Sequence, residues 1–360
     1  MVAIPCLWKD EGANGTDDHG RMLAAGHGAR LWRRAMIRTL AAGASRQTLG
    51  MLSVAAGVSI FSLQDAIVKG MSASFPVHEI VFVRSLVAFP LLLFATVAEA
   101  RGWPAFRRLG LHFLRGLLMY VAFTAYYLAI AHLQIAETVA LFFVAPLLVA
   151  ALSPPVLGER VTPRSWIAIA IGGAGMLVIL RPGLDALDPV LFLPLFAALA
   201  YALSVLCGRR LGQSQSGAAM ALSATVVYVL ASGAMAIALA GKPPPAGADA
   251  SIKFLLSPWV WAGARDLGLM AACGAISAAA FFFLGQGYRM AEANRAAPFE
   301  YASLPWSILW GYLFFGNLPD LPTLLGALVI VYGGIYALRL EGGAWPRKAA
   351  LVILSDEDKP

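Results

Sequence analysis

Oppositely charged side chains lie in two neighbouring apolar segments near the start of the chain. Asp65 is close to one end of the segment 49–69, and Arg84 is about seven residues into the segment 78–98. As consecutive membrane helices, these segments would hold the two side chains at comparable depth, with Arg84 roughly 10 Å below one surface. A charge at the bilayer centre costs at least about 2.5–3.5 kcal/mol, which pairing would reduce. We expect either a substrate-binding or coupling pair or a purely structural clamp, while Lys69 should reach the headgroups.

A carboxylate, Glu300, lies about five residues into another apolar segment, 295–315, with no Lys or Arg deeper in that segment. A carboxylate in apolar surroundings can carry a coupling proton or bind a cationic atom of a substrate. Alternatively, Glu300 turns back toward Arg295 at the interface.

Aromatic and amide side chains supply the other half of a candidate substrate site. Flat rings with a few hydroxyl or amide groups suit a planar heteroaromatic ligand. Aromatic side chains in membrane helices also commonly face lipid or form interfacial belts, so either role is open for each one. The candidates are Tyr127, Phe143, Tyr201, Gln286, Tyr301 and Trp306.

The composition requires these residues to be positioned by membrane helices. The chain has 360 residues, of which 59% are hydrophobic and 13% charged, with a mean hydropathy of +0.73. This excludes a soluble enzyme, a disordered protein and a secreted disulfide scaffold. Since about 20 apolar residues cross a bilayer as a helix, we predict an all-α integral membrane protein with ten transmembrane helices. They span 49–69, 78–98, 111–131, 135–155, 163–181, 189–208, 218–240, 267–288, 295–315 and 321–339.

The distribution of Lys and Arg predicts the orientation. Loops on the side of the N-terminus carry more of them than the opposite loops, so both termini should be cytoplasmic. This also explains the net charge of +7 without a nucleic-acid partner. Residues 1–46 are predicted to be a basic cytoplasmic tail without fixed structure, or alternatively to contain an amphipathic helix at 29–42. Residues 342–360 are predicted to be a second cytoplasmic tail, and 241–265 a linker outside the bilayer.

The two halves of the chain resemble each other weakly. Pro146 and Gly175 in the first half correspond to Pro305 and Gly333 in the second. We therefore predict two five-helix repeats, 49–181 and 189–341. Because five is odd, the second repeat must be inverted, as in many secondary transporters. Pro146 and Pro305 should interrupt backbone hydrogen bonds within their helices, which makes them gating candidates.

Several segments resemble the drug/metabolite transporter superfamily. The segment LGERVTPRSWIAIAIGGAGMLVILRPG is similar to the end of an EamA-type repeat, and APFEYASLPWSILWGYLFFGNLPDLPTLLGALVIVYGGIYALRLE is similar to the second copy. The segments SLQDAIVKG, FVRSLVAFP and FLRGLLMYVAFTAYYLAI fit the branch that includes riboflavin and S-adenosylmethionine transporters. The resemblance covers about 49–341. One departure is Asn317, which stands where the first repeat has Glu159.

We predict a secondary transporter that moves a small organic metabolite across the cytoplasmic (inner) membrane by alternating access. The resemblance implies a riboflavin-like or S-adenosylmethionine-like substrate. An amino-acid or drug exporter of the same fold is the alternative, and a non-transporting scaffold or a channel is the alternative of another class. Protons and a second copy of the chain are open as partners.

An enzyme is not expected, because the sequence contains no HExxH, GxSxG or GxxxxGK[ST] motif. We also expect no cofactor and no metal.

Overall fold

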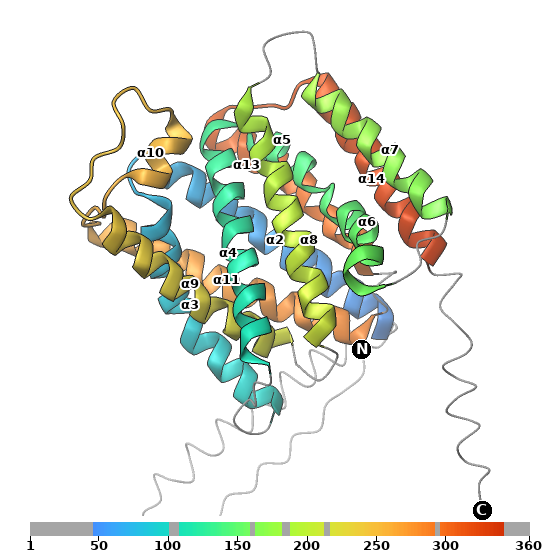
Figure 1. The fold of residues 1–360 in the computed structure, drawn as a ribbon, viewed down its shortest axis with the longest axis horizontal. Helices are drawn as coiled ribbons and strands as arrows, with labels where there is room; N and C mark the ends of the chain where they lie inside the picture. Colours follow the sequence, from blue (N-terminus) through green and yellow to red (C-terminus); the bar gives the residue numbers. More distant parts are fainter. Residues whose placement is uncertain are drawn as a thin grey trace, which may run out of the picture. The chain divides into compact units, whose positions relative to one another are not determined.

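A computed structural model describes residues 46–100, 108–158, 163–181, 188–211, 217–291 and 296–341. All regular secondary structure in these ranges is helical (Figure 1). The expectations for residues 1–45 and 342–360, and for Glu159, lie outside the described residues.

The helices follow the predicted apolar segments. The first half contains α2 (Arg46–Met71), α3 (Val77–Ala100), α4 (Leu109–His132), α5 (Ile135–Phe142), α6 (Ala145–Leu157) and α7 (Pro163–Leu180). The second half contains the 3-10 helix η1 (Pro189–Leu191), α8 (Phe192–Leu211), α9 (Gly217–Leu239), α10 (Ala250–Leu256), α11 (Ala264–Met290), the 3-10 helix η2 (Ala297–Ala302), α13 (Ser303–Phe315) and α14 (Leu321–Glu341).

Seven segments of the described chain are long and apolar enough to cross a membrane. They are Gln47–Met71, Val77–Ala98, Leu109–His132, Ile135–Leu157, Pro189–Leu211, Gly217–Leu239 and Ala264–Gly287. The apolar stretches Trp166–Leu180 and Leu321–Tyr336 are shorter. The predicted all-helical, multi-pass membrane fold is confirmed, while the number of ten crossings stays a prediction.

Two of the predicted spans are not uniform α-helices. The span 135–155 divides into α5 and α6, with Phe143 and Val144 between them. The described part of the span 295–315 begins with η2 and continues as α13. Pro146 is the second residue of α6 and Pro305 the third of α13, so neither proline interrupts the middle of a helix as we expected. Pro146 lies in the first turn of α6, where the missing N–H costs no hydrogen bond within the helix. Pro305 follows directly on the 3-10 helix η2.

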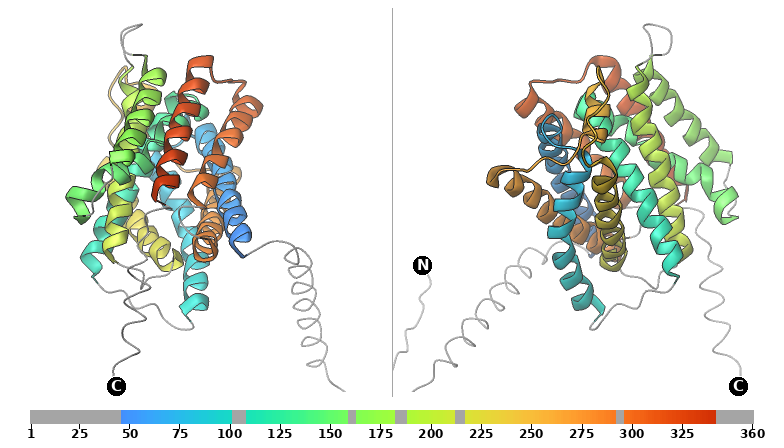
Figure 2. Two further views of the ribbon diagram at one scale, coloured as in Figure 1. Left: turned by 90° about the vertical axis from the view of Figure 1, so that its right-hand side faces the viewer. Right: turned by 60° about the vertical axis from the view of Figure 1, so that its left-hand side comes forward.

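Close helix packing depends on glycine. The helix α2 packs along α11 (Figure 2), where Gly50 faces Gly287: a Cβ atom built on Gly287 would lie 2.9 Å from the carbonyl oxygen of Gly50. The helices α7 and α14 lie side by side (Figure 1) and approach through Gly175 and Gly326. Small residues allow such approach in lipid, where the hydrophobic effect does not drive helices together.

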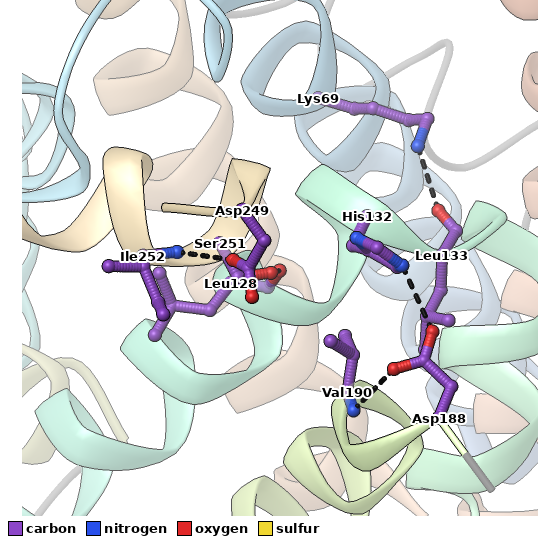
Figure 3. Close-up of polar contacts among 9 residues, drawn as sticks. All are labelled: Lys69, Leu128, His132, Leu133, Asp188, Val190, Asp249, Ser251 and Ile252. Carbon is purple, nitrogen blue, oxygen red and sulfur yellow. Dashed lines mark hydrogen bonds and ion pairs between the residues drawn. The ribbon is translucent and has the colours of Figure 1, made fainter. Parts of the chain in front are cut away.

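The carboxyl end of α4 is held by residues from neighbouring elements (Figure 3). The Nζ of Lys69 donates hydrogen bonds to the carbonyl oxygens of Ile130 at 2.6 Å and Leu133 at 2.7 Å. His132 contacts the Asp188 carboxylate, with Nε2 and Oδ2 3.0 Å apart. Lys69 thus binds the end of α4, because the last carbonyl groups of a helix lack partners within the helix and attract a cation. Its expected place at the headgroups stays a prediction.

The predicted linker at 241–265 contains the short helix α10 (Figure 3). Asp249 caps its first turn by accepting a hydrogen bond from the Ile252 N–H at 2.8 Å. Ser251 donates to the Leu128 carbonyl of α4 at 2.8 Å, and Phe254 is buried. The linker is thus anchored to the helical bundle, which its three prolines and polar residues did not indicate.

Candidate functional site

The centre of the candidate site is the buried guanidinium of Arg84 on α3, whose residue is 3% exposed. Three aromatic rings surround it, with Cζ 5.4 Å from the ring centroid of Phe123, 5.3 Å from that of Tyr127 and 5.8 Å from that of Tyr228. Nη1 also donates to the Tyr127 hydroxyl at 2.8 Å and to Ser277 Oγ at 3.5 Å. The ring faces attract the cation through their negative quadrupoles.

Gln64 of α2 connects these groups. In the amide orientation that matches donors with acceptors, its oxygen accepts from the Tyr127 hydroxyl at 2.5 Å and from Arg84 Nη1 at 2.9 Å. Its nitrogen then donates to Ser277 Oγ at 2.5 Å and to the Cys273 carbonyl at 2.9 Å. The network joins α2, α3, α4 and α11. Such a buried polar network favours one arrangement of its helices, because breaking it leaves unpaired groups in a low dielectric.

Asp65 and Arg84 do not form the direct ion pair that we expected; the ion pairs of the described residues do not include them. Instead, Asp65 Oδ2 accepts a hydrogen bond from the Tyr126 hydroxyl at 2.9 Å, while Arg84 binds the hydroxyl of Tyr127. The two charges still interact electrostatically. Two consecutive tyrosines of α4 thus each hydrogen-bond one of the two charged side chains.

A second group of candidates gathers where α5 gives way to α6. The ring of Phe142 lies 5.3 Å from that of Tyr126 and 5.4 Å from that of Tyr201, centroid to centroid. Phe143 meets Tyr301 of η2 edge-on at 4.9 Å. The chain of rings therefore continues from the Arg84 network across α5 to α8.

The Glu300 carboxylate interacts electrostatically with both Tyr201 and Tyr301. The structure thus places Phe143 against Tyr301, and both Tyr201 and Tyr301 within electrostatic reach of Glu300. Whether they bind substrate stays a prediction.

The remaining candidates are Trp306, Gln286 and the two prolines. Trp306 is 39% exposed and stacks on Trp310 at 5.6 Å. It is Trp310 that reaches inward, where its Nε1 donates to Ser62 Oγ at 3.0 Å. Gln286 is partly buried near the end of α11, and Pro146 and Pro305 are both exposed.

Sequence reasoning missed Gln64, Tyr228 and Ser277. Gln64 could have been found, because a glutamine beside Asp65 in an apolar segment is costly to bury without partners. Tyr228 and Ser277 carry no such signal, since tyrosine and serine occur widely in membrane helices.

Comparison with known proteins finds a family match in the first half of the chain. Residues 48–181 match the EamA-like transporter family. The chain is also similar in fold to a solved crystal structure, with a TM-score of 0.57, 17% identity, and coverage of 84% of this chain and all of that one.

Relatives named as transporters align with most of the chain. A riboflavin transporter of Rhizobium johnstonii is 29% identical over 84% of this chain and 95% of its own length. A pseudopaline exporter of Pseudomonas aeruginosa is 27% identical, covering 82% and 97%. An S-adenosylmethionine uptake transporter of Rickettsia conorii is 23% identical, covering 80% and 91%. Residues 48–181 are therefore an EamA-family domain, and the chain is a multi-pass membrane protein homologous to small-molecule transporters, consistent with the drug/metabolite transporter superfamily.

Proposed function

We propose that this protein is a secondary transporter that moves a small organic metabolite across the bacterial inner membrane by alternating access. The observation that carries the proposal is the homology with named transporters over about four-fifths of the chain and nearly the whole length of the relatives. The buried cation and the chain of rings provide polar and aromatic groups away from lipid, as a substrate path requires.

We propose further that ten helices form two inverted repeats, 49–181 and 189–341. In this arrangement α2, α3, α4, α5–α6 and α7 correspond in order to η1–α8, α9, α11, η2–α13 and α14. If each helix is replaced by its counterpart in the other repeat, the contact between α2 and α11 becomes a contact between α8 and α4, which the structure also has. In the same way, the contact between α2 and α13 becomes the contact between α8 and α6. The contacts of α3 with α9 and of α7 with α14 map onto themselves. This pairing supports a pseudo-twofold axis.

Gating is proposed to occur at the interruptions in the two corresponding spans. Pro146 follows the end of α5 by four residues, and Pro305 lies at the start of α13 after η2. Interrupted helices at corresponding positions of inverted repeats are a feature of transporter substrate sites. Both termini are proposed to be cytoplasmic, on the basis of the distribution of Lys and Arg.

The substrate is proposed to be riboflavin-like or S-adenosylmethionine-like. The relatives' names support these two classes, and the rings of Phe142, Phe143, Tyr201 and Tyr301 suit a planar ligand. Glu300 is the proposed proton-coupling group, since it lies among these rings.

Counterflow in proteoliposomes tests the proposal. Vesicles are loaded with unlabelled riboflavin, S-adenosylmethionine or an amino acid, diluted into a trace of the same labelled compound, and compared with protein-free vesicles. A carrier produces a transient accumulation of label that saturates with concentration. Unsaturable leakage would indicate a channel instead. No flux of any compound, from protein whose folding is verified, would favour a scaffold.

A further inference from the structure

The last turn of α2 carries a basic residue, Lys69, that holds the ends of two other helices. Its Nζ donates to the carbonyl oxygens of Ile130 at 2.6 Å and Leu133 at 2.7 Å, at the carboxyl end of α4 (Figure 3). Nζ also lies 5.5 Å from the ring centroid of Phe315, the last residue of α13. Unpaired carbonyl groups and an aromatic ring face both attract an ammonium group. Lys69 therefore joins the ends of α2, α4 and α13.

The last turn of α8 carries two basic residues, Arg209 and Arg210, that hold the end of α6. Arg209 Nη1 donates to Ser153 Oγ at 3.3 Å, and the Arg210 guanidinium donates to the Val156 carbonyl. Both acceptors belong to the last turns of α6. Arg108, which precedes α4, donates to the Arg210 carbonyl at 3.2 Å. The end of α8 is therefore bound to the end of α6, beside the beginning of α4.

These two groups of contacts lie at opposite ends of the helical bundle. The first is at the carboxyl end of α4 and the second at its amino end. Since α4 has 24 residues, its ends are roughly 36 Å apart. In the proposed repeats α2 corresponds to α8, and α13 corresponds to α6. The two groups are thus counterparts, because in each a basic residue ending the first helix of one repeat holds the end of the interrupted span of the other.

The contacts at the two ends differ in kind from those of the close helix pairs. The pairs α2–α11 and α7–α14 meet backbone to backbone at glycines, so their separation would break close packing. Lys69, Arg209 and Arg210 instead reach their partners with long side chains, and both arginines are exposed. A long basic side chain can release its acceptor and keep its charge in water. The ends of α6 and α13 can therefore move while the close pairs stay together.

We propose that these contacts are the two gates of the transporter, one for each side of the membrane. The inference rests on the proposed transport function and its inverted repeats. With the proposed orientation, Lys69 closes the outer gate, and Arg209 with Arg210 closes the cytoplasmic gate. Alternating access opens one side while the other stays closed. Both groups of contacts are formed in this structure, so loss of one group shifts the population toward opening on its own side.

Distances between spin labels at each gate test the proposal without a known substrate. The full-length protein is used in liposomes, with its three native cysteines replaced by serine. The outer gate is labelled through G70C with L318C, at two exposed positions, and the cytoplasmic gate through P155C with L211C, at an exposed and a partly exposed position. Double electron–electron resonance then gives the distribution of distances for each pair.

The two gate variants should shift these distributions in opposite directions. We expect K69M to raise the ratio of open to closed outer gates roughly tenfold and to reduce opening of the cytoplasmic gate, since it loses charge-assisted hydrogen bonds. The double variant R209M with R210M should do the reverse. The controls K253M and R265M remove the same charges at exposed positions and should leave both distributions as in the wild type. A purely structural role for the basic residues would loosen the bundle without opposite shifts.

Widening of both label pairs in either gate variant, no change in either pair, or the same change in K253M or R265M would overturn the proposal. Should K69M fail to fold, F315L removes only the ring beside Nζ and must still widen the outer pair. In the same way, S153A must widen the cytoplasmic pair. Opposite shifts without counterflow would refute transport but not the gates. Counterflow with unchanged distances in the gate variants would refute the gates but not transport.

Discussion

Replacing Gly175 of α7 with alanine should weaken the contact between α7 and α14. A Cβ atom at this position would lie 2.7 Å from the carbonyl oxygen of Gly326 and 2.9 Å from the backbone nitrogen of Ile330. Both atoms belong to the backbone of α14, so no side-chain rotation relieves the clash. The two helices would have to separate along their length.

Gly173 provides the matched control, because a Cβ atom built there has no neighbour within 4 Å. Alanine at either position raises helix propensity by about 1 kcal/mol, so this contribution cancels between the two variants. The variant G175A alone adds an overpacking cost of about 1–3 kcal/mol. We therefore expect G175A to be less stable than G173A by about 1–3 kcal/mol.

The assay compares thermal unfolding of both variants and the wild type, purified in the same detergent. G173A should unfold at or above the wild-type temperature, and G175A clearly below G173A. Equal unfolding temperatures would show that α7 and α14 do not approach as closely as the structure has them, and would remove one of the contacts that support the repeat symmetry.

Three further predictions concern charged side chains. E300Q should abolish the pH dependence of uptake while sparing binding; an unchanged pH profile would exclude Glu300 from coupling. K69M should lower the unfolding temperature, because two carbonyl oxygens at the end of α4 lose their hydrogen bonds. Each carbonyl that stays unpaired costs about 1–3 kcal/mol of stability. An unfolding temperature equal to that of the wild type would contradict the role of Lys69 in holding this helix end. Burial alone would raise the pKa of Asp320, but hydrogen bonds from Arg181 and Thr323 outweigh it and lower this pKa below 3.8. The contribution of ionised Asp320 to folding stability is fully present above the pKa of an aspartate in the unfolded chain, about 3.9. It is lost as the pH falls through the lower pKa of Asp320 in the folded protein. Because the side chain is half exposed, the effect should be about 0–1 kcal/mol, and D320N should remove it from unfolding temperatures measured against pH.

The sequence was sufficient for the membrane class and for the approximate helices. Bilayer thickness sets the length of a spanning helix, so runs of apolar residues between charges predict its limits to within a few residues. The depth of a charge along one helix follows in the same way, which is why Arg84 and Glu300 could be selected before the fold was known. The breaks near Pro146 and Pro305 could be located only approximately, because the same proline is compatible with a kink or with a new first turn.

The partners of these charges were decided by the tertiary structure. Arg84 meets aromatic rings on α4 and α9 and a serine on α11, and Asp65 meets Tyr126 rather than Arg84. Equal depth does not determine which faces of two helices meet, since successive residues point about 100° apart around a helix. Only packed helices fix those faces, so the sequence by itself determined which groups must find partners in the membrane, and the tertiary structure determined which partners they find.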